Sequence, residues 1–333
     1  MINEDNAHAK STIPTRRKFL SGAGAVGSAA ILAASNTKKA KSTESPAIIK
    51  PASAADRLRN LIAAPESISA PVVYDLMSAK LAQYLGFPLI TVGGSTVSSG
   101  MYGMGDYGMA TITELIEVAA RMAAGVDIPV IADADDCGGN PLNVYRALRR
   151  YAQADVACVL IEDMSGAKHV PGRPEGRLIS AAEMVDKIKA AVDAAGTGGP
   201  AILARCDGLS KDLSFEESLE RIVMYSEAGA ELVFMSGAQP AQHRVVAETT
   251  GKAVFSTGGG KNTADILAAH KVKVAVFAIE SFALNAAHQA MRDLKQHGDP
   301  SRTLLGLPRE VSSELYDSKH WAEISRRFNA QSY

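Results

Sequence analysis

Acidic residues follow two short apolar runs at positions where they could act together on a small charged molecule. One run ends in Asp133-Ala134-Asp135 and a later one ends in Glu162. Residues two apart on a strand face the same side, so Asp133 and Asp135 can point together, and Glu162 can join them from an adjacent strand. Three convergent carboxylates repel one another unless a cation neutralises them, and Mg²⁺ is the usual partner of such oxygen ligands. These three residues are the predicted metal ligands; the alternative for each acid is a helix cap or turn residue.

Basic residues complement these acids. Arg205 ends a further apolar run, where its guanidinium can fork onto a substrate carboxylate; the alternative is a structural ion pair with Asp207 or Glu162. The long stretch 164–180 combines glycines with cations that include Lys168 and His169. This composition is typical of a mobile lid over an anionic ligand, although an exposed basic loop would have the same composition.

The elements that must position these residues alternate regularly from residue 71 onward. The predicted strands are 71–75, 88–94, 129–135, 157–163, 201–207, 232–237, 253–258 and 272–278, with amphipathic helical stretches between them at 113–124, 142–153, 181–194, 215–228 and 263–270. Eight strands, each followed by a helix, predict an α/β fold of the (β/α)₈ TIM-barrel type over residues 56–300. A doubly wound sheet would show the same alternation, but no GxGxxG follows the first strand. Residues 301–333 are predicted to form a C-terminal helical extension.

Composition excludes several other classes of protein. The 333 residues are 47% hydrophobic and 21% charged, which excludes long disordered, collagen-like and coiled-coil chains. The formal net charge is −1 and the body has no dense Lys/Arg run, so nucleic acid is not an expected partner. The three cysteines form no CxxC pair, which indicates neither a disulfide framework nor a zinc site.

The first 40 residues differ from the rest of the chain. They contain six basic and two acidic residues, and Arg16-Arg17 precedes Phe19-Leu20 and a Gly/Ala-rich apolar stretch. This pattern resembles a twin-arginine export signal and predicts a periplasmic protein, with a cytoplasmic protein carrying a basic tail as the alternative. The apolar stretch is too short to span a bilayer, so no stable membrane insertion is expected. Residues 41–55 have the composition of a linker.

Residues 56–295 resemble the isocitrate lyase/phosphoenolpyruvate mutase superfamily, which includes 2-methylisocitrate lyase, carboxyphosphonoenolpyruvate mutase and oxaloacetate decarboxylase. The segments that carry the resemblance are Val73-Tyr74-Asp75, Val92-Gly93-Gly94-Ser95, Asp133-Ala134-Asp135, Gly139-Asn140-Pro141-Leu142-Asn143, Ile161-Glu162-Asp163 and Ala204-Arg205-Cys206-Asp207. The resemblance implies a (β/α)₈ barrel, Mg²⁺ (or Mn²⁺) as cofactor, small carboxylate substrates, and a homotetramer, a dimer of dimers, that exchanges a terminal helix between subunits.

The resemblance also implies roles for individual residues. It places Asp133, Asp135 and Glu162 around the metal, Lys168, Arg205 and Asp106 in catalysis, and Tyr74, Asp75, Gly93, Gly94, Ser95 and Arg205 at the substrate. It implies a Mg²⁺-dependent lyase or decarboxylase that cleaves a C–C bond of a small 2-oxo or 2-hydroxy acid, such as oxaloacetate, through a pyruvate enolate.

The chain departs from the superfamily pattern in its predicted lid. Isocitrate-type lyases carry a Lys-Lys/Arg-Cys-Gly-His motif there, with the cysteine as acid-base group, whereas this chain has Lys168-His169-Val170-Pro171-Gly172. Three alternatives therefore remain beside the decarboxylase: a 2-methylisocitrate-type lyase, a carboxyphosphonoenolpyruvate-type mutase, and a non-catalytic periplasmic binder of anionic metabolites.

Overall fold

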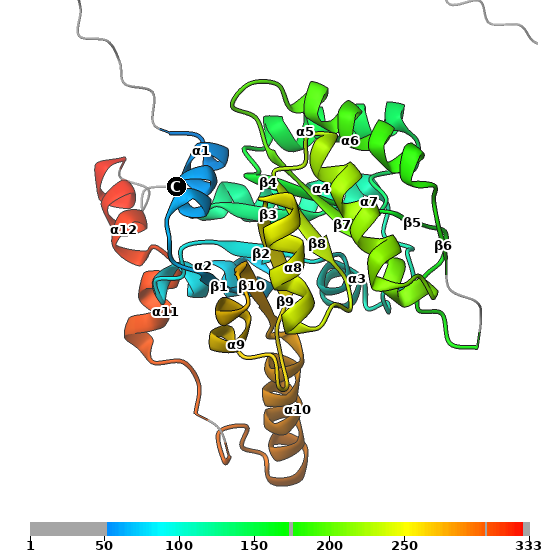
Figure 1. Ribbon diagram of the computed structural model, residues 1–333. Coiled ribbons are helices and arrows are strands. Elements are labelled where there is room, and N and C mark those ends of the chain that lie inside the picture. The colour runs from blue at the N-terminus through cyan, green and yellow to red at the C-terminus, as the bar shows by residue number, and fades with distance from the viewer. Residues whose placement is uncertain (1–51, 173–175, 304, 329–333) are drawn as a thin grey trace, which may run out of the picture. The chain divides into compact units, whose positions relative to one another are not determined.

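Eight parallel strands close into a barrel in the computed structural model, which describes residues 52–172, 176–303 and 305–328 (Figure 1). The strands follow one another around the barrel in the order β1 (Ile68–Val73), β10 (Val272–Ala278), β9 (Ala253–Thr257), β8 (Leu232–Met235), β7 (Ala201–Cys206), β4 (Cys158–Glu162), β3 (Val130–Asp133) and β2 (Ile90–Val92). Each predicted strand is present, and the predicted (β/α)₈ barrel is confirmed.

Helices surround the barrel and, except for the last of them, return the chain from the end of one strand to the start of the next. They are α2 (Leu76–Tyr84), α3 (Gly94–Tyr102), α4 (Ile112–Gly125), α5 (Pro141–Gln153), α6 (Ala181–Ala195), α7 (Phe215–Glu227), α8 (Pro240–Thr250), α9 (Ala264–Ala269) and α10 (Glu280–His297), with a short 3₁₀ turn at Gly208–Lys211. Their starts are specified locally: Thr111 with Glu114, and Ser214 with Glu217, form capping boxes that satisfy free N–H groups of α4 and α7.

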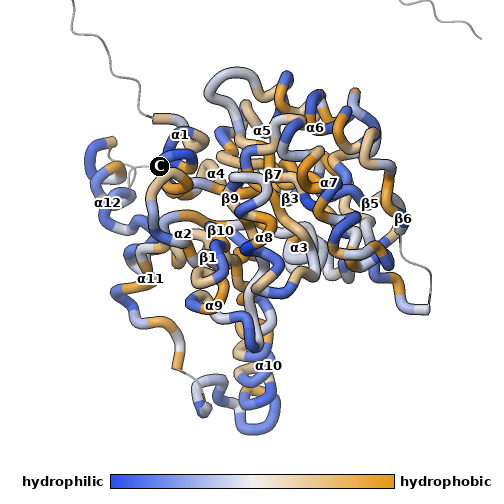
Figure 2. Tube along the Cα trace, in the orientation of Figure 1, coloured by the Kyte–Doolittle hydropathy of each residue, from blue (hydrophilic) through white to orange (hydrophobic). Residues whose placement is uncertain are grey.

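The barrel has two apolar layers, because alternate residues of each strand face opposite sides. Leu160 of β4 and Leu203 of β7 belong to one buried cluster, to which Leu58 of α1 (Ala54–Ala63) also contributes. Their neighbours Ile161 and Ile202 belong to the cluster packed against the surrounding helices. Strands buried on both sides explain why the sequence shows continuous apolar runs, visible as the orange core in Figure 2.

Two features of the described chain differ from the sequence-based expectations. A two-stranded antiparallel sheet, β5 (Met164–Ser165) with β6 (Arg177–Leu178), forms the base of the predicted lid, where no strand was expected. Helix α1 begins at Ala54, inside the range expected to be a linker. The predicted export signal lies outside the described residues. No helix in the described part of the chain is long and apolar enough to cross a membrane.

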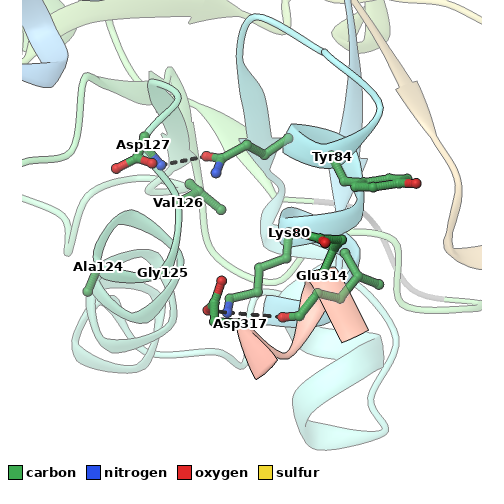
Figure 3. A pocket seen from close by; sticks show the side chains of 10 residues that line it. Lys80, Tyr84, Ala124, Gly125, Val126, Asp127, Glu314 and Asp317 are labelled. Carbon is green, nitrogen blue, oxygen red and sulfur yellow. Dashed lines mark hydrogen bonds and ion pairs between the residues drawn. The ribbon is translucent and has the colours of Figure 1, made fainter. Parts of the chain in front are cut away.

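Helices α11 (Arg309–Leu315) and α12 (Ser318–Arg327) fall within the expected C-terminal extension and contact the barrel through α2. The Lys80 ammonium lies 2.5 Å from an Asp317 carboxylate oxygen and donates a hydrogen bond of 3.1 Å to the Leu315 carbonyl (Figure 3). A hollow of about 420 Å³ lies beside this contact. It is lined by none of the predicted site residues, so it is separate from the acidic cluster.

Candidate active site

The predicted acidic residues converge where β3 and β4 end. Asp133 is the last residue of β3, and Glu162 is the last residue of β4 and only 2% exposed. Asp135 does not share a strand face with Asp133, because β3 has ended and Asp135 has a left-handed backbone with φ 49°. The expectation that Asp133 and Asp135 face the same side of one strand is therefore wrong. The two carboxylates still converge, because the turn at Ala134 directs the Asp135 carboxylate toward the cluster.

Gly94 fixes the spacing of the two aspartates. The Gly94 N–H donates to Asp133 Oδ2 at 3.0 Å, and the Asp135 N–H donates to Asp133 Oδ1 at 3.0 Å. A Cβ at position 94 would lie 2.7 Å from Asp135 Oδ1 and 3.2 Å from Asp133 Oδ2. The start of α3 can approach both carboxylates only because residue 94 has no side chain.

Lys168 reaches into the cluster from the lid. Its ammonium lies 2.6 Å from Asp135 Oδ1, 3.1 Å from Glu162 Oε1 and 3.8 Å from Asp106 Oδ1, and the residue is only 4% exposed. The structure thus brings the predicted catalytic residues Lys168 and Asp106 to two of the predicted metal ligands. A long charged side chain is buried this deeply only where paired charges compensate its desolvation.

The charges of the cluster are strongly coupled. Burial raises the pKa of Glu162 to about 8, and the positive charges of Arg205 and Lys168 oppose this rise. Burial and the negative charge of Asp133 raise the pKa of Asp135 to about 6. Burial alone would lower the pKa of Lys168, but the surrounding carboxylates raise it above its usual value. Burial therefore opposes the ionised form of both carboxylates, and a cation bound beside them would favour that form.

The donor set fits a divalent cation that retains part of its water shell. Glu162 Oε2 and Asp106 Oδ1 are buried oxygens without a hydrogen-bond partner, and the ammonium of Lys168 already shows where a positive charge is stabilised. In the described ranges, no three His, Cys, Asp or Glu side chains stand close enough to enclose a bare ion. Carboxylates that reach an ion partly through water suit Mg²⁺, which keeps several waters when it binds to proteins.

Asp207 orients Arg205. The sequence suggested Asp207 only as a partner of Arg205 in a structural ion pair, the alternative to substrate binding. Arg205 Nε and Nη2 donate to both oxygens of Asp207 at 2.7–3.1 Å, while Nη1 lies 3.5 Å from Glu162 Oε2. The guanidinium carbon lies 5.4 Å from the centre of the Phe234 ring. The structural ion pair with Asp207 therefore exists, and it fixes the guanidinium at the barrel mouth.

A hollow of about 160 Å³ lies at the mouth beside Arg205. Gly93, Ser95 and Asp133 also line it, so with Arg205 it collects four of the predicted substrate and metal residues. Its volume lies below the roughly 300–1,000 Å³ typical of pockets for drug-sized ligands, which indicates a small substrate. A second hollow of about 360 Å³, lined by Asp135, Glu162 and Lys168, adjoins the lid.

Tyr74 and Asp75 lie at the start of α2 and line neither of these two hollows. The Asp75 carboxylate accepts a hydrogen bond of 2.7 Å from the Ser78 N–H, and the Ser78 side chain caps in return. Asp75 thus caps the start of α2, which is the structural role that an acid after a strand can have instead of a functional one.

Sequence reasoning missed a buried network behind Arg205. Asp163 is fully buried and accepts hydrogen bonds from the Asp207 N–H at 2.8 Å and from the Tyr225 hydroxyl at 2.7 Å. Arg221 Nη1 lies 3.3 Å from the same carboxylate. The signal in the sequence was Arg221 and Tyr225 four residues apart on one helix face, which must meet the same buried partner.

Comparisons with known proteins agree with this geometry. Residues 58–297 match the family model of phosphoenolpyruvate phosphomutase. The chain is 34% identical over 282 residues to an oxaloacetate decarboxylase of Rhodopseudomonas palustris strain BisB5, covering 82% of this chain and 94% of the relative. It is 31% identical over 265 residues to the 2-methylisocitrate lyase of Salmonella typhimurium strain LT2, covering 76% and 88%.

A solved structure shows the same architecture. The phosphoenolpyruvate phosphomutase of Streptomyces platensis subsp. rosaceus superposes with a TM-score of 0.75 at 29% identity, covering 82% of this chain and 99% of that one. The matched region contains the barrel and all the acidic residues at its mouth. The chain therefore belongs to the phosphoenolpyruvate phosphomutase family, and it is an enzyme of the phosphoenolpyruvate mutase/isocitrate lyase superfamily.

Proposed function

We propose that this enzyme is a Mg²⁺-dependent lyase that decarboxylates oxaloacetate or a close 2-oxo acid relative. The observation that carries the proposal is the arrangement at the barrel mouth: a cation position at Asp135 and Glu162, marked by the Lys168 ammonium, and a hollow of about 160 Å³ that Arg205 lines. The similarity to an oxaloacetate decarboxylase over most of both chains supports the same reaction.

The residues have separate roles in this proposal. Asp133, Asp135 and Glu162 would hold the metal, partly through water, while Arg205 would bind the substrate carboxylate and the backbone N–H of Ser95 one of its oxygens. The N–H groups of Gly93 and Gly94 already donate to Thr96 and Asp133. When bound, Mg²⁺ would stabilise the negative charge that develops on the 2-oxo oxygen. Asp207 keeps the guanidinium of Arg205 in place, so the substrate is oriented before its bond breaks.

The lid supports decarboxylation over cleavage of a tricarboxylate. Cleaving a 2-methylisocitrate-like substrate leaves a dicarboxylate carbanion that needs a proton on one face, and Val170 has no proton to give. In a decarboxylation CO₂ leaves without a proton, and the pyruvate enolate accepts one from water. General acid catalysis is typically worth about 10²–10⁴-fold, so its loss penalises tricarboxylate cleavage more.

The test is a side-by-side measurement of kcat/KM for oxaloacetate, 2-methylisocitrate and a phosphonopyruvate with Mg²⁺ present. We expect oxaloacetate to give the highest value. A higher value for 2-methylisocitrate or for the phosphonate would replace the proposal by the lyase or the mutase alternative. No turnover of any of them, combined with tight oxalate binding, would favour the non-catalytic binder.

Metal binding has an independent readout. We expect Mg²⁺ with oxalate, a mimic of the enolate, to raise the melting temperature, because a ligand that binds only the folded state stabilises it by mass action. Glu162→Gln should remove most of this shift. An unchanged melting temperature of the unaltered enzyme with Mg²⁺ and oxalate would contradict the metal site.

We also propose that the enzyme is a homotetramer that exchanges a terminal helix, and the apolar surface of α10 supports this proposal. Leu284, Met291 and Leu294 on this helix are each more than half exposed. We further propose that the enzyme is exported. The proposed export rests on Arg16-Arg17 together with Phe19-Leu20 and the apolar stretch that follows. Replacing both arginines by lysine should retain the active enzyme in the cytoplasm, and periplasmic protein from that variant would contradict a twin-arginine signal.

A further inference from the structure

A separate polar pocket lies outside the barrel mouth, between the starts of α5 and α6 and the base of the lid. It has a volume of about 400 Å³, and Asn140, Ser165, Ser180 and Lys187 are among the residues that line it. It shares Asp136 and Ser165 with the wall of the hollow that contains Lys168, so it adjoins the candidate active site without being part of it.

Lys187 is the unusual member of this pocket. The residue is only 1% exposed, yet its ammonium makes no ion pair or hydrogen bond with any described residue. Lys168, the other buried lysine, is by contrast surrounded by carboxylates. An ammonium that has lost most of its water without gaining a partner is costly, and burial lowers the pKa of Lys187 accordingly.

Two helices begin at this pocket. Ser180 is the N-cap of α6, which has 15 residues, and its hydroxyl accepts from the Glu183 N–H; this leaves the N–H groups of Ala181 and Ala182 without a partner in the helix. Asn140 is the N-cap of α5 and accepts from the N–H groups of residues 142 and 143. Each helix start carries a positive partial charge of about half an elementary charge.

Two acids, Asp136 and Glu183, also line the pocket and attract the Lys187 ammonium, but the desolvation of Lys187 outweighs this attraction. Asp136 Oδ1 accepts a hydrogen bond from the Gly138 N–H at 2.8 Å, and Glu183 is exposed in the first turn of α6, where the helix start already stabilises its charge. Arg177, which also lines the pocket, adds a further positive charge. A second cation would be repelled by Lys187, Arg177 and both helix starts, so the pocket favours an anion.

We propose that this pocket binds a small divalent oxyanion, which accepts hydrogen bonds from the buried ammonium of Lys187 and from the free N–H groups at the start of α6. The anion would rest against Ser165 and Arg177, the paired residues of β5 and β6. Since these strands form the base of the lid that carries Lys168, the occupant would stabilise the lid from outside the active site.

The test is titration calorimetry of the full chain with sulfate, and in a separate arm with succinate, which distinguishes a tetrahedral oxyanion from a dicarboxylate. We expect one anion to bind per chain. Lys187→Met keeps the length and apolar stem of the side chain and should weaken binding about ten- to a hundredfold, the loss expected for one charged hydrogen bond. Lys189→Met, which changes an exposed lysine two residues further along α6, is the matched control and should bind like the unaltered enzyme.

A third variant separates this pocket from the barrel mouth. If the anion binds at the mouth, Arg205→Met abolishes binding and Lys187→Met preserves it, and the proposal is overturned. Absence of binding of both sulfate and succinate to the unaltered chain would overturn it as well. Should Lys187→Met fail to fold, crystals of the unaltered enzyme soaked in selenate give the same decision: an anomalous peak beside Lys187 supports the site, and a peak elsewhere or none refutes it.

Discussion

Asp135 carries an unfavourable charge at the barrel mouth, because it is buried and faces Asp133. Its pKa is raised from 3.8 to about 6, so the folded state binds its proton more readily than the unfolded chain and loses stability as pH rises through this window. The ion pair with Lys168 offsets only part of this cost. Near pH 7, this carboxylate serves function at the expense of stability.

We therefore expect Asp135→Ala to abolish turnover while stability without metal stays the same or rises. Turnover falls because a metal ligand and the partner of Lys168 disappear together. Urea unfolding at pH 7.5 without divalent cations measures the stability, and Asp186→Ala, an exposed acid on α6, is the control. Near-normal turnover of a folded Asp135→Ala variant would remove Asp135 from the site.

Gly94 gives a second prediction for a single residue. In Gly94→Ala the new methyl group would lie 2.7 Å from Asp135 Oδ1, so this carboxylate must move away. A displacement of about 1 Å at a reacting centre can cost about 10²-fold in rate, and we expect a loss of that size in kcat/KM with little loss of stability. Gly306→Ala, at a position with no atom within 4 Å of the new methyl and without a positive φ, is the control and should keep the full rate.

For single residues, the sequence predicted which residues form the site better than it predicted how they are arranged. Asp133, Glu162 and Arg205 were recognisable because polar residues at the end of apolar strands have few structural reasons to be there. The left-handed turn at Asp135 could not be predicted, since nothing local distinguishes it from a continuing strand. The support of Arg205 through Asp207 and Asp163 was missed because it joins three segments distant in sequence.

Among the elements, the predicted lid carries the departure from the superfamily pattern on which the proposed decarboxylation rests. Val170 stands in the position where related lyases carry their acid-base cysteine, while Lys168 is already engaged by Asp135 and Glu162. If the lid closes as in those lyases, Val170→Cys should increase kcat/KM for 2-methylisocitrate and leave oxaloacetate decarboxylation nearly unchanged. Pro171→Cys, one residue further along, is the positional control. An increase in neither reaction would show that position 170 does not face the substrate.

Helix α8 is joined to strand β9 by a buried histidine. His243 Nε2 lies 2.9 Å from Ser256 Oγ, and burial lowers the pKa of His243 from 6.5 to about 4. Between these two pH values the unfolded chain binds a proton that the folded chain does not bind. The folded state therefore loses stability as pH falls from 6.5 to 4, by up to about 3 kcal/mol.

We expect His243→Gln to remove this part of the pH dependence. Urea unfolding between pH 4.5 and 7.5 should show a smaller fall in stability for His243→Gln than for the unaltered enzyme. The exposed His320 of α12 provides the control, since His320→Gln should keep the full dependence. Parallel pH curves for the unaltered enzyme and His243→Gln would show that His243 is not neutral in the folded state.

The prediction of helices and strands succeeded where the burial pattern and the capping residues agree. The barrel strands are buried on both sides and read as apolar runs, and helices such as α4 and α7 begin at capping boxes. The sheet of β5 and β6 was missed because its strands have two residues each and pair across the lid. So short a run has no periodicity to recognise.

At the scale of the whole molecule, the exposed apolar face of α10 supports the proposed tetramer. Leu284 and Met291 are seven residues apart and share a helix face that Leu294 extends, and all three are more than half exposed. Figure 1 shows α10 following the last strand of the barrel and preceding the C-terminal helices. An apolar face of this kind marks a contact between proteins, which fits the proposed tetramer.

The last prediction follows from this face. A carboxylate placed in a subunit interface must be desolvated without a partner, which costs far more than the same charge in water. We expect the unaltered enzyme to sediment as a tetramer and the double variant Leu284→Glu, Met291→Glu to sediment as a smaller species at the same micromolar concentration. Asn285→Glu adds a charge at an exposed position on a different side of the same helix and should leave the tetramer intact. A monomeric unaltered enzyme would contradict the tetramer, whereas a tetramer that survives both glutamates would place the interface away from this face of α10.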